Sequence, residues 1–209
     1  KPNVRRPPRH PLSAEYHPPP QKRSLERLGI PLVLFLGALF LYLAFRSTSL
    51  DDFDSYSFAL ALDHYSLPLQ QPHPPGFPIY ITFGHLLKFL VGDATAALTT
   101  LSALSGAASI VLVHHLGRTI DPEYPATGLL AALLMMFLPM HWLTTEKALS
   151  DGPGLTAMLL ALWLWARWIR QGAGKVPWTA ALFSGLTLGV RPQNALPFLF
   201  LAIYLVFRA

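Results

Sequence analysis

The sequence has no cysteine among its 209 residues and few charged side chains. The absence of cysteine excludes disulfide bonds and thiolate metal sites. Charged residues make up 13% of the chain, against about 25% in soluble domains. The sequence also lacks a P-loop, a GxGxxG fingerprint, an HExxH pair and a serine-hydrolase elbow. These absences argue against the enzyme classes that such motifs mark.

Long apolar runs accompany this low charge. Hydrophobic residues make up 52% of the chain, and the mean hydropathy is +0.39. Several runs approach the roughly 20 residues that a helix needs to cross a bilayer. The net charge is +5, but the basic residues gather in the N-terminal tail and at the ends of the runs. That placement is typical of topology signals. We therefore predict an all-α polytopic membrane protein that binds no nucleic acid.

The chain divides into a tail and a membrane region. Residues 1–28 are rich in proline and arginine and lack apolar periodicity, which predicts a disordered basic cytoplasmic tail. The region 29–209 is the predicted transmembrane module, in which residues 47–95 form an outer loop. Its six predicted spans are 29–46, 97–117, 126–143, 153–170, 177–190 and 194–207.

The apolar segment 77–91 is assigned differently from these spans. It is only about 15 residues long and contains His85 and Lys88, which favours a helix lying on the membrane surface. Placing it on the outer face puts Arg118 and Arg170 on the same side as the basic tail, as the positive-inside rule requires. We therefore predict a multi-pass protein of the bacterial inner-membrane type, with both ends of the chain cytoplasmic.

This topology gathers most of the reactive side chains at the outer surface. They are Asp51, Asp52, Asp54, His73, His141, Glu146, Lys147, Asp151 and Arg191. The inner connections hold little beyond basic anchors. Any chemistry is therefore expected on the outer side.

An acidic run begins where the first predicted span ends. Asp54 directly precedes a predicted helix, so its carboxylate could cap that helix. Alternatively, Asp52 and Asp54 act at the membrane surface, as a base towards an acceptor hydroxyl or as oxygen ligands of a divalent cation. The sequence leaves these interpretations open.

Two charged residues stand beside later spans. Asp151, followed by Gly152 and Pro153, suits a helix start, so it too could be a cap. The predicted topology brings it to the same face as Asp54, and carboxylates from separate loops can form one site. A lone Arg191 usually anchors a span at the headgroups. On the outer side, its guanidinium suits a lipid phosphate.

The loop QPHPPGFP, residues 71–78, contains four prolines and a glycine. This composition excludes both helix interior and sheet. We predict a rigid bend where the chain leaves the acidic loop and lies down on the membrane surface. The bend is expected to place His73 near that acidic loop.

The order of these features resembles the polytopic GT-C glycosyltransferases, which include protein O-mannosyltransferases and aminoarabinose transferases. The shared order is a basic tail, one span, an acidic motif, an HPPG loop, two spans and an acidic residue that starts the next span. The segment HPPGFPIYITFGHLLKFLVGD is similar to one branch of that superfamily. The resemblance covers about residues 30–208.

The resemblance implies an inverting glycosyltransferase that moves a sugar from a polyprenyl-phosphate donor to an acceptor on the outer face. It implies that Asp54 is the catalytic aspartate, with Asp52 as the other candidate and Asp151 as the second acidic position. Arg191 would contact the donor phosphate. The other expected substrate-binding residues are His73, Glu146 and Lys147.

The chain departs from this pattern in two ways. Many relatives have Asp-Glu where this chain has Asp54-Ser55, and they usually have more spans. The chain is therefore either a fragment of a longer enzyme or a reduced member. The alternative hypothesis is a non-catalytic GT-C-like subunit, held in a larger membrane complex by its spans and tail. The sugar, the acceptor and any divalent cation stay open.

Overall fold

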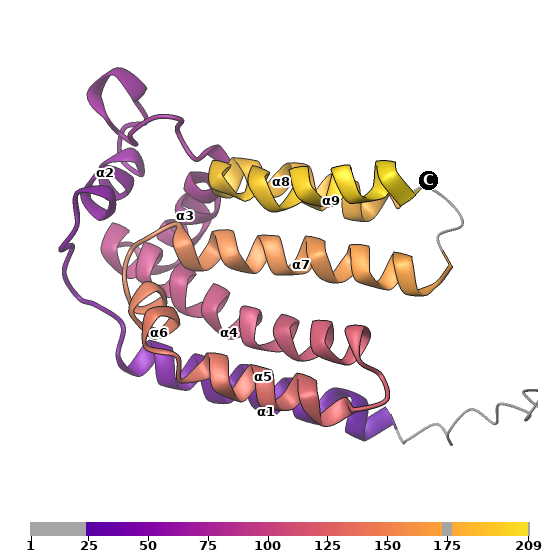
Figure 1. The fold of residues 1–209 in the computed structure, drawn as a ribbon. Helices are drawn as coiled ribbons and strands as arrows, with labels where there is room; N and C mark the ends of the chain where they lie inside the picture. Colours follow the sequence, from indigo (N-terminus) through magenta and orange to yellow (C-terminus); the bar gives the residue numbers. More distant parts are fainter. Residues whose placement is uncertain (1–23, 173–176, 209) are drawn as a thin grey trace, which may run out of the picture.

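Helices joined by short loops make up the described residues, 24–172 and 177–208, of this computed structural model. No strand occurs among those residues, so the predicted all-α class is confirmed. Six helices form a bundle (Figure 1), and the residues of each overlap one predicted span. They are α1 (Ser24–Ala44), α4 (Ala94–Ile120), α5 (Pro125–Met136), α7 (Asp151–Arg170), α8 (Trp178–Val190) and α9 (Ala195–Arg208).

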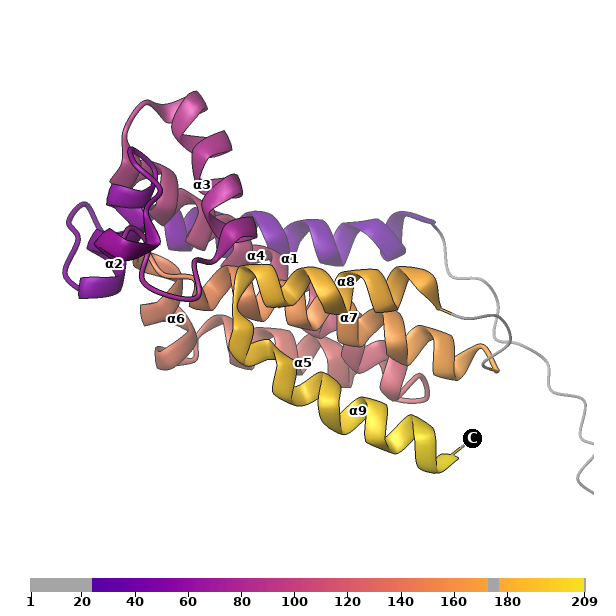
Figure 2. The same cartoon turned by 90° about the horizontal axis from the view of Figure 1, so that it is seen from above.

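The central helix of the bundle is α4, which packs against α1, α5 and α7. The outermost helix is α9, which runs along the edge of the bundle beside α8 (Figure 2). Five short elements gather at the end of the bundle that lies opposite the C-terminus (Figure 1). They are α2 (Phe53–Ala61), the 3-10 turn η1 (Leu67–Leu69), α3 (Pro78–Val91), α6 (Pro139–Glu146) and the 3-10 turn η2 (Pro192–Asn194).

The number of membrane spans remains a prediction. By length and apolar composition, α4 is the one described helix that could cross a membrane unaided. A second would be added if α5 and α6 together form one broken span. The apolar parts of α1, α3 and α8 are shorter.

The predicted span 126–143 is not one continuous helix. The chain bends by 60° between α5 and α6. Pro139 begins α6, and Leu138 before it is extended, with a ψ of 121°. A residue that precedes proline is disfavoured in the helical region, which explains the break. As a result, α6 belongs to the end of the bundle that carries the charged residues.

The predicted tail, 1–28, lies mostly outside the described residues. Its last part is described, and residues 24–28 already belong to α1. The segment 77–91 forms the separate helix α3, which packs against α4 and α8. Its place on the membrane surface remains a prediction.

Small residues allow α4 and α5 to approach closely. Gly128 on α5 faces the backbone of α4, and a Cβ placed on it would lie 2.5 Å from the carbonyl oxygen of His114. Nearby, Ala107 and Ala132 are fully buried in one cluster. Tyr42 of α1 donates a hydrogen bond of 3.0 Å to the carbonyl of Met136, where α5 ends. The cluster thus joins three helices and satisfies a helix-terminal carbonyl.

Gly128→Ala should destabilise the bundle by about 1–3 kcal/mol, because a backbone carbonyl cannot move aside as a side chain can. The measurement is thermal unfolding in mild detergent, where a drop of several degrees is expected. The matched control is Gly185→Ala on α8, where a Cβ would meet no atom within 4 Å. Equal melting temperatures for the two variants would contradict the close contact of α4 and α5.

Candidate functional site

The charged residues predicted to share one face lie around the end of the bundle formed by α2, α3, α6, the start of α7 and the end of α8 (Figure 1). The loop after α1 is fastened there, because the Ser47 amide donates a hydrogen bond of 2.9 Å to the Glu146 carbonyl. Side-chain contacts join six of these residues in three pairs.

The first pair joins Asp151 and Arg191. Arg191 follows α8 in an extended conformation, and its Nη1 donates to Asp151 Oδ2 at 2.8 Å and to Ser150 Oγ at 3.0 Å. Asp151 is the first residue of α7, and Ser150 holds the cap position, so the capping role considered for Asp151 is not seen. Gly154 makes room for the arginine, since a Cβ there would lie 2.8 Å from Arg191 Cβ. Arg191 therefore lies flat against the first turn of α7.

A cavity of about 390 Å³ opens beside this pair. Methionine and leucine side chains line part of it, and polar groups line the rest. The apolar lining residues are Met135, Leu138, Met140, Leu155 and Met158. The polar lining residues are His141, Thr144, Asp151, Arg191 and Asn194. The cavity therefore combines an apolar wall with an ion pair.

Sequence reasoning gave no role to two polar residues of this cavity. Asn194 is buried and donates from Nδ2 to the Gly154 carbonyl at 2.8 Å, which ties η2 to α7. His141 is buried, and its Nε2 lies 3.3 Å from Ser109 Oγ. Its Nδ1 has no hydrogen-bond partner among the described residues. The sequence did contain one indication for Asn194, because it is a polar residue that follows Arg191 closely, between two apolar runs.

The second pair joins Asp54 and His73. His73 Nδ1 lies 3.0 Å from Ser57 Oγ and 3.7 Å from Asp54 Oδ1. Asp54 lies within the first turn of α2, so it does not cap that helix as one interpretation held. Asp52 occupies the cap position but makes no capping hydrogen bond. The acidic side chains are thus free for other partners.

The predicted rigid bend brings His73 to α2. The bend contains cis peptide bonds before Pro72 and Pro75 and a positive φ of 104° at Gly76. A Cβ at Gly76 would lie 2.3 Å from the Tyr65 hydroxyl, so only glycine fits without displacement. Tyr65 donates a hydrogen bond of 3.1 Å to the Gly76 carbonyl and fastens the bend.

The third pair joins Lys147, just after α6, to Asp52. Lys147 Nζ donates to Asp52 Oδ2 at 3.1 Å, and this hydrogen bond raises the pKa of Lys147. The Glu146 side chain makes no ion pair among the described residues, but its negative charge adds to the effect on Lys147. The pair connects the end of α6 with the start of α2.

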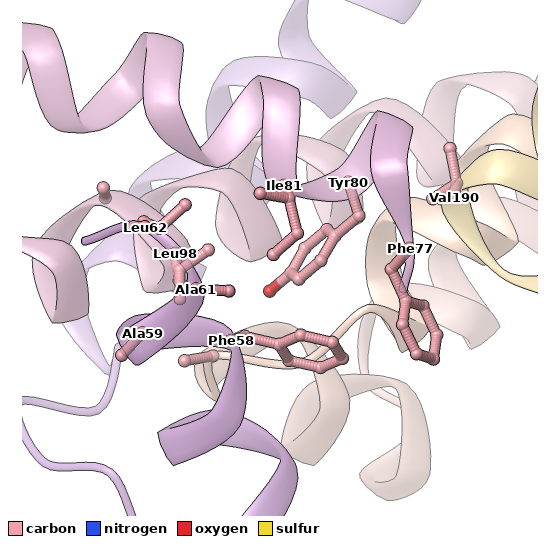
Figure 3. Packing of buried hydrophobic residues seen from close by; sticks show 11 residues of the cluster. Phe58, Ala59, Ala61, Leu62, Phe77, Tyr80, Ile81, Leu98 and Val190 are labelled. Atoms are coloured by element: carbon pink, nitrogen blue, oxygen red, sulfur yellow. The ribbon is translucent and has the colours of Figure 1, made fainter. Parts of the chain in front are cut away.

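Phe58, Phe77 and Tyr80 form a buried aromatic cluster at this end of the bundle (Figure 3). The Phe58 ring is 5.3 Å from the His73 ring and 4.8 Å from the Tyr80 ring, measured between centroids. Burial raises the pKa of Tyr80, and the charge of Asp151 adds to that effect. Among the described residues, no hydrogen bond or ion pair joins Asp54 to Asp151. The two carboxylates therefore belong to separate pairs.

Comparison with known proteins identifies the family. The family model described as dolichyl-phosphate-mannose-protein mannosyltransferase matches residues 72–209. The chain belongs to this family. The match includes the HPPG loop, Asp151 and Arg191, and it begins after Asp52 and Asp54. No curated protein and no solved structure matches the chain.

Membership in the mannosyltransferase family confirms the predicted resemblance at the level of the family. It indicates a GT-C glycosyltransferase of the mannosyltransferase type, in a family of integral membrane proteins. The specific branch and a truncated or reduced status remain predictions.

Within the described part of the chain, no group of three or more His, Asp or Glu side chains is placed to hold a metal ion. The two acidic positions are instead engaged with His73 and Arg191. We therefore assign no metal ligands among residues 24–172 and 177–208.

A double-mutant cycle of Asp151→Asn and Arg191→Gln should give a coupling energy of about 1 kcal/mol, because both side chains are only partly exposed. The measurement is thermal unfolding in detergent. The matched control is the Asp63–Lys88 pair, whose aspartate is 69% exposed. That pair should couple by less than about 0.5 kcal/mol. A coupling no larger than the control would show that Arg191 is not held by Asp151.

Proposed function

We propose that the chain transfers a sugar, with inversion, from a polyprenyl-phosphate donor to an acceptor on the outer membrane face. The observation that carries this proposal is the cavity beside Asp151 and Arg191, in a member of the mannosyltransferase family. A guanidinium suits a phosphate, and the methionine and leucine wall suits an isoprenoid tail. One cavity therefore offers both chemistries that a lipid-linked sugar needs.

In the transfer, the acceptor oxygen attacks C1 of the sugar, and the bond from C1 to the phosphate oxygen breaks. The electron pair of that bond leaves with the lipid phosphate, so negative charge develops there. Arg191 lies in position to neutralise this charge, and Asp151 with Ser150 fixes its direction. Asn194 holds the turn that carries Arg191 against α7.

Asp54 serves the acceptor in this proposal. Asp54 is more exposed than His73, its partner, and 53% of its side chain is accessible to solvent. A carboxylate in that position can orient an acceptor hydroxyl and favour its deprotonation. Asp52 and Lys147, which pair beside Glu146, would form the rim that contacts the substrates.

Asp54→Asn should lower the transfer rate at least about 100-fold, the usual contribution of a group that assists proton removal. The assay measures transfer from a short-chain polyprenyl-phosphate mannose by purified protein in vesicles. The matched control is Asp63→Asn, an exposed aspartate near the end of α2, which should leave the rate unchanged. Unchanged transfer by Asp54→Asn would refute its role, and no transfer by the wild type would favour the non-catalytic subunit.

Arg191→Gln should raise the KM for the donor by about 10- to 100-fold, because a hydrogen bond to a charged group contributes about 1.5–3 kcal/mol. Arg46→Gln is the matched control, since Arg46 lies at the same end of the bundle but bonds to Thr100. Its donor KM should not change. An equal donor KM for the wild type and Arg191→Gln would show that the donor phosphate does not bind beside Arg191 in this cavity.

A further inference from the structure

The hydrogen bonds around Ser57 determine which nitrogen of His73 carries the proton. A serine hydroxyl has one proton, and Ser57 donates it to the Asp54 carbonyl at 3.0 Å. Ser57 Oγ must therefore accept the other hydrogen bond, from His73 Nδ1 at 3.0 Å. In a neutral imidazole with a proton on Nδ1, the lone pair lies on Nε2.

The His73 ring is held firmly while Nε2 stays accessible. Its centroid lies 5.3 Å from that of Phe58 and 4.9 Å from that of Phe77, and 21% of the side chain is exposed. Nε2 has no hydrogen-bond partner among the described residues. Unlike ring nitrogens of His114 and His141, it is not among the buried atoms without a partner. A lone pair therefore faces the outside from a fixed ring.

Asp54 lies beside the same ring nitrogen of His73 that contacts Ser57. Its Oδ1 lies 3.7 Å from Nδ1, on the side away from the free lone pair. The other ring contacts come from Phe58 on α2 and Phe77 before α3, and neither carries charge. Among the described residues, Asp54 is the one charged side chain within ion-pair distance of His73. The ring therefore has one anionic neighbour, which lies on its Nδ1 side and leaves Nε2 unobstructed.

We infer that His73 is the proton acceptor of the reaction and that Asp54 acts through it. This inference rests on the proposed transfer and reassigns the base. As the acceptor oxygen bonds to C1, its O–H bond breaks and the proton moves to His73 Nε2. The C1–phosphate bond breaks with its electron pair on the phosphate, so atoms and charge balance. Ser57 then serves as a positioning residue that fixes the tautomer.

An asparagine at position 73 distinguishes a role of His73 in proton transfer from a role in packing. The amide nitrogen of asparagine takes about the position of Nδ1, so His73→Asn keeps the donor to Ser57 but has no base at Nε2. His73→Asn should therefore fold like the wild type, yet lose at least about 100-fold in kcat. The exposed His64, on the loop after α2, supplies the matched control His64→Asn, which should keep full activity.

The test uses purified full-length chain in vesicles with short-chain polyprenyl-phosphate mannose, and thermal unfolding checks the fold of each variant. His73→Ala should be inactive and regain activity with added imidazole, which can take the place of the ring that packs against Phe58 and Phe77. The dependence of kcat on pH should be flatter in His73→Asn than in the wild type. Near-normal activity of a folded His73→Asn, or no rescue of a folded His73→Ala, would overturn the inference while leaving the transfer intact. No transfer by the wild type would overturn both.

Discussion

The ion pair between Asp151 and Arg191 is the contact on which the arrangement of this end of the molecule depends. It joins the start of α7 to the end of α8, and Gly154 lets the arginine lie against the helix. An arginine beside an apolar cavity is costly without a partner, and Asp151 and Ser150 supply that partner. With Arg191 fixed, Asn194 and η2 follow, and the chain turns into α9. The cavity exists because these segments are held together.

Prolines determine where the rest of the site lies. Pro139 interrupts the run that would otherwise continue α5, so α6 carries His141 and Lys147 to the charged end of the bundle. The HPPG bend does the same for His73, which reaches back to α2. Both devices work by excluding conformations, because proline fixes φ and restricts the residue before it. The site is therefore assembled from segments that change direction abruptly.

The sequence was sufficient to locate the helices, since apolar runs of the right length leave few alternatives. It also gathered the charged residues at one end, because that conclusion needs only alternating topology. It also predicted that the HPPG bend brings His73 near the acidic loop, and His73 lies 3.7 Å from Asp54. It could not show that Asp151 pairs with Arg191, which lies 40 residues further along the chain. The 60° bend at Pro139 was missed because the run 126–143 is apolar on both sides of it. Hydropathy alone does not show where a chain changes direction within an apolar run.

Asp54 and Asp151 have separate partners, and the proposed reaction gives a chemical reason for this. Transfer from a lipid phosphate needs charge neutralised on one side of the sugar and a proton removed on the other. In the proposed transfer, Arg191 beside Asp151 would serve the phosphate, whereas His73 beside Asp54 would serve the proton. Phe58 and Phe77 pack against His73, and the pKa of Tyr80 in the same cluster is raised by burial and further by the nearby charge of Asp151. The aromatic cluster therefore connects the two pairs.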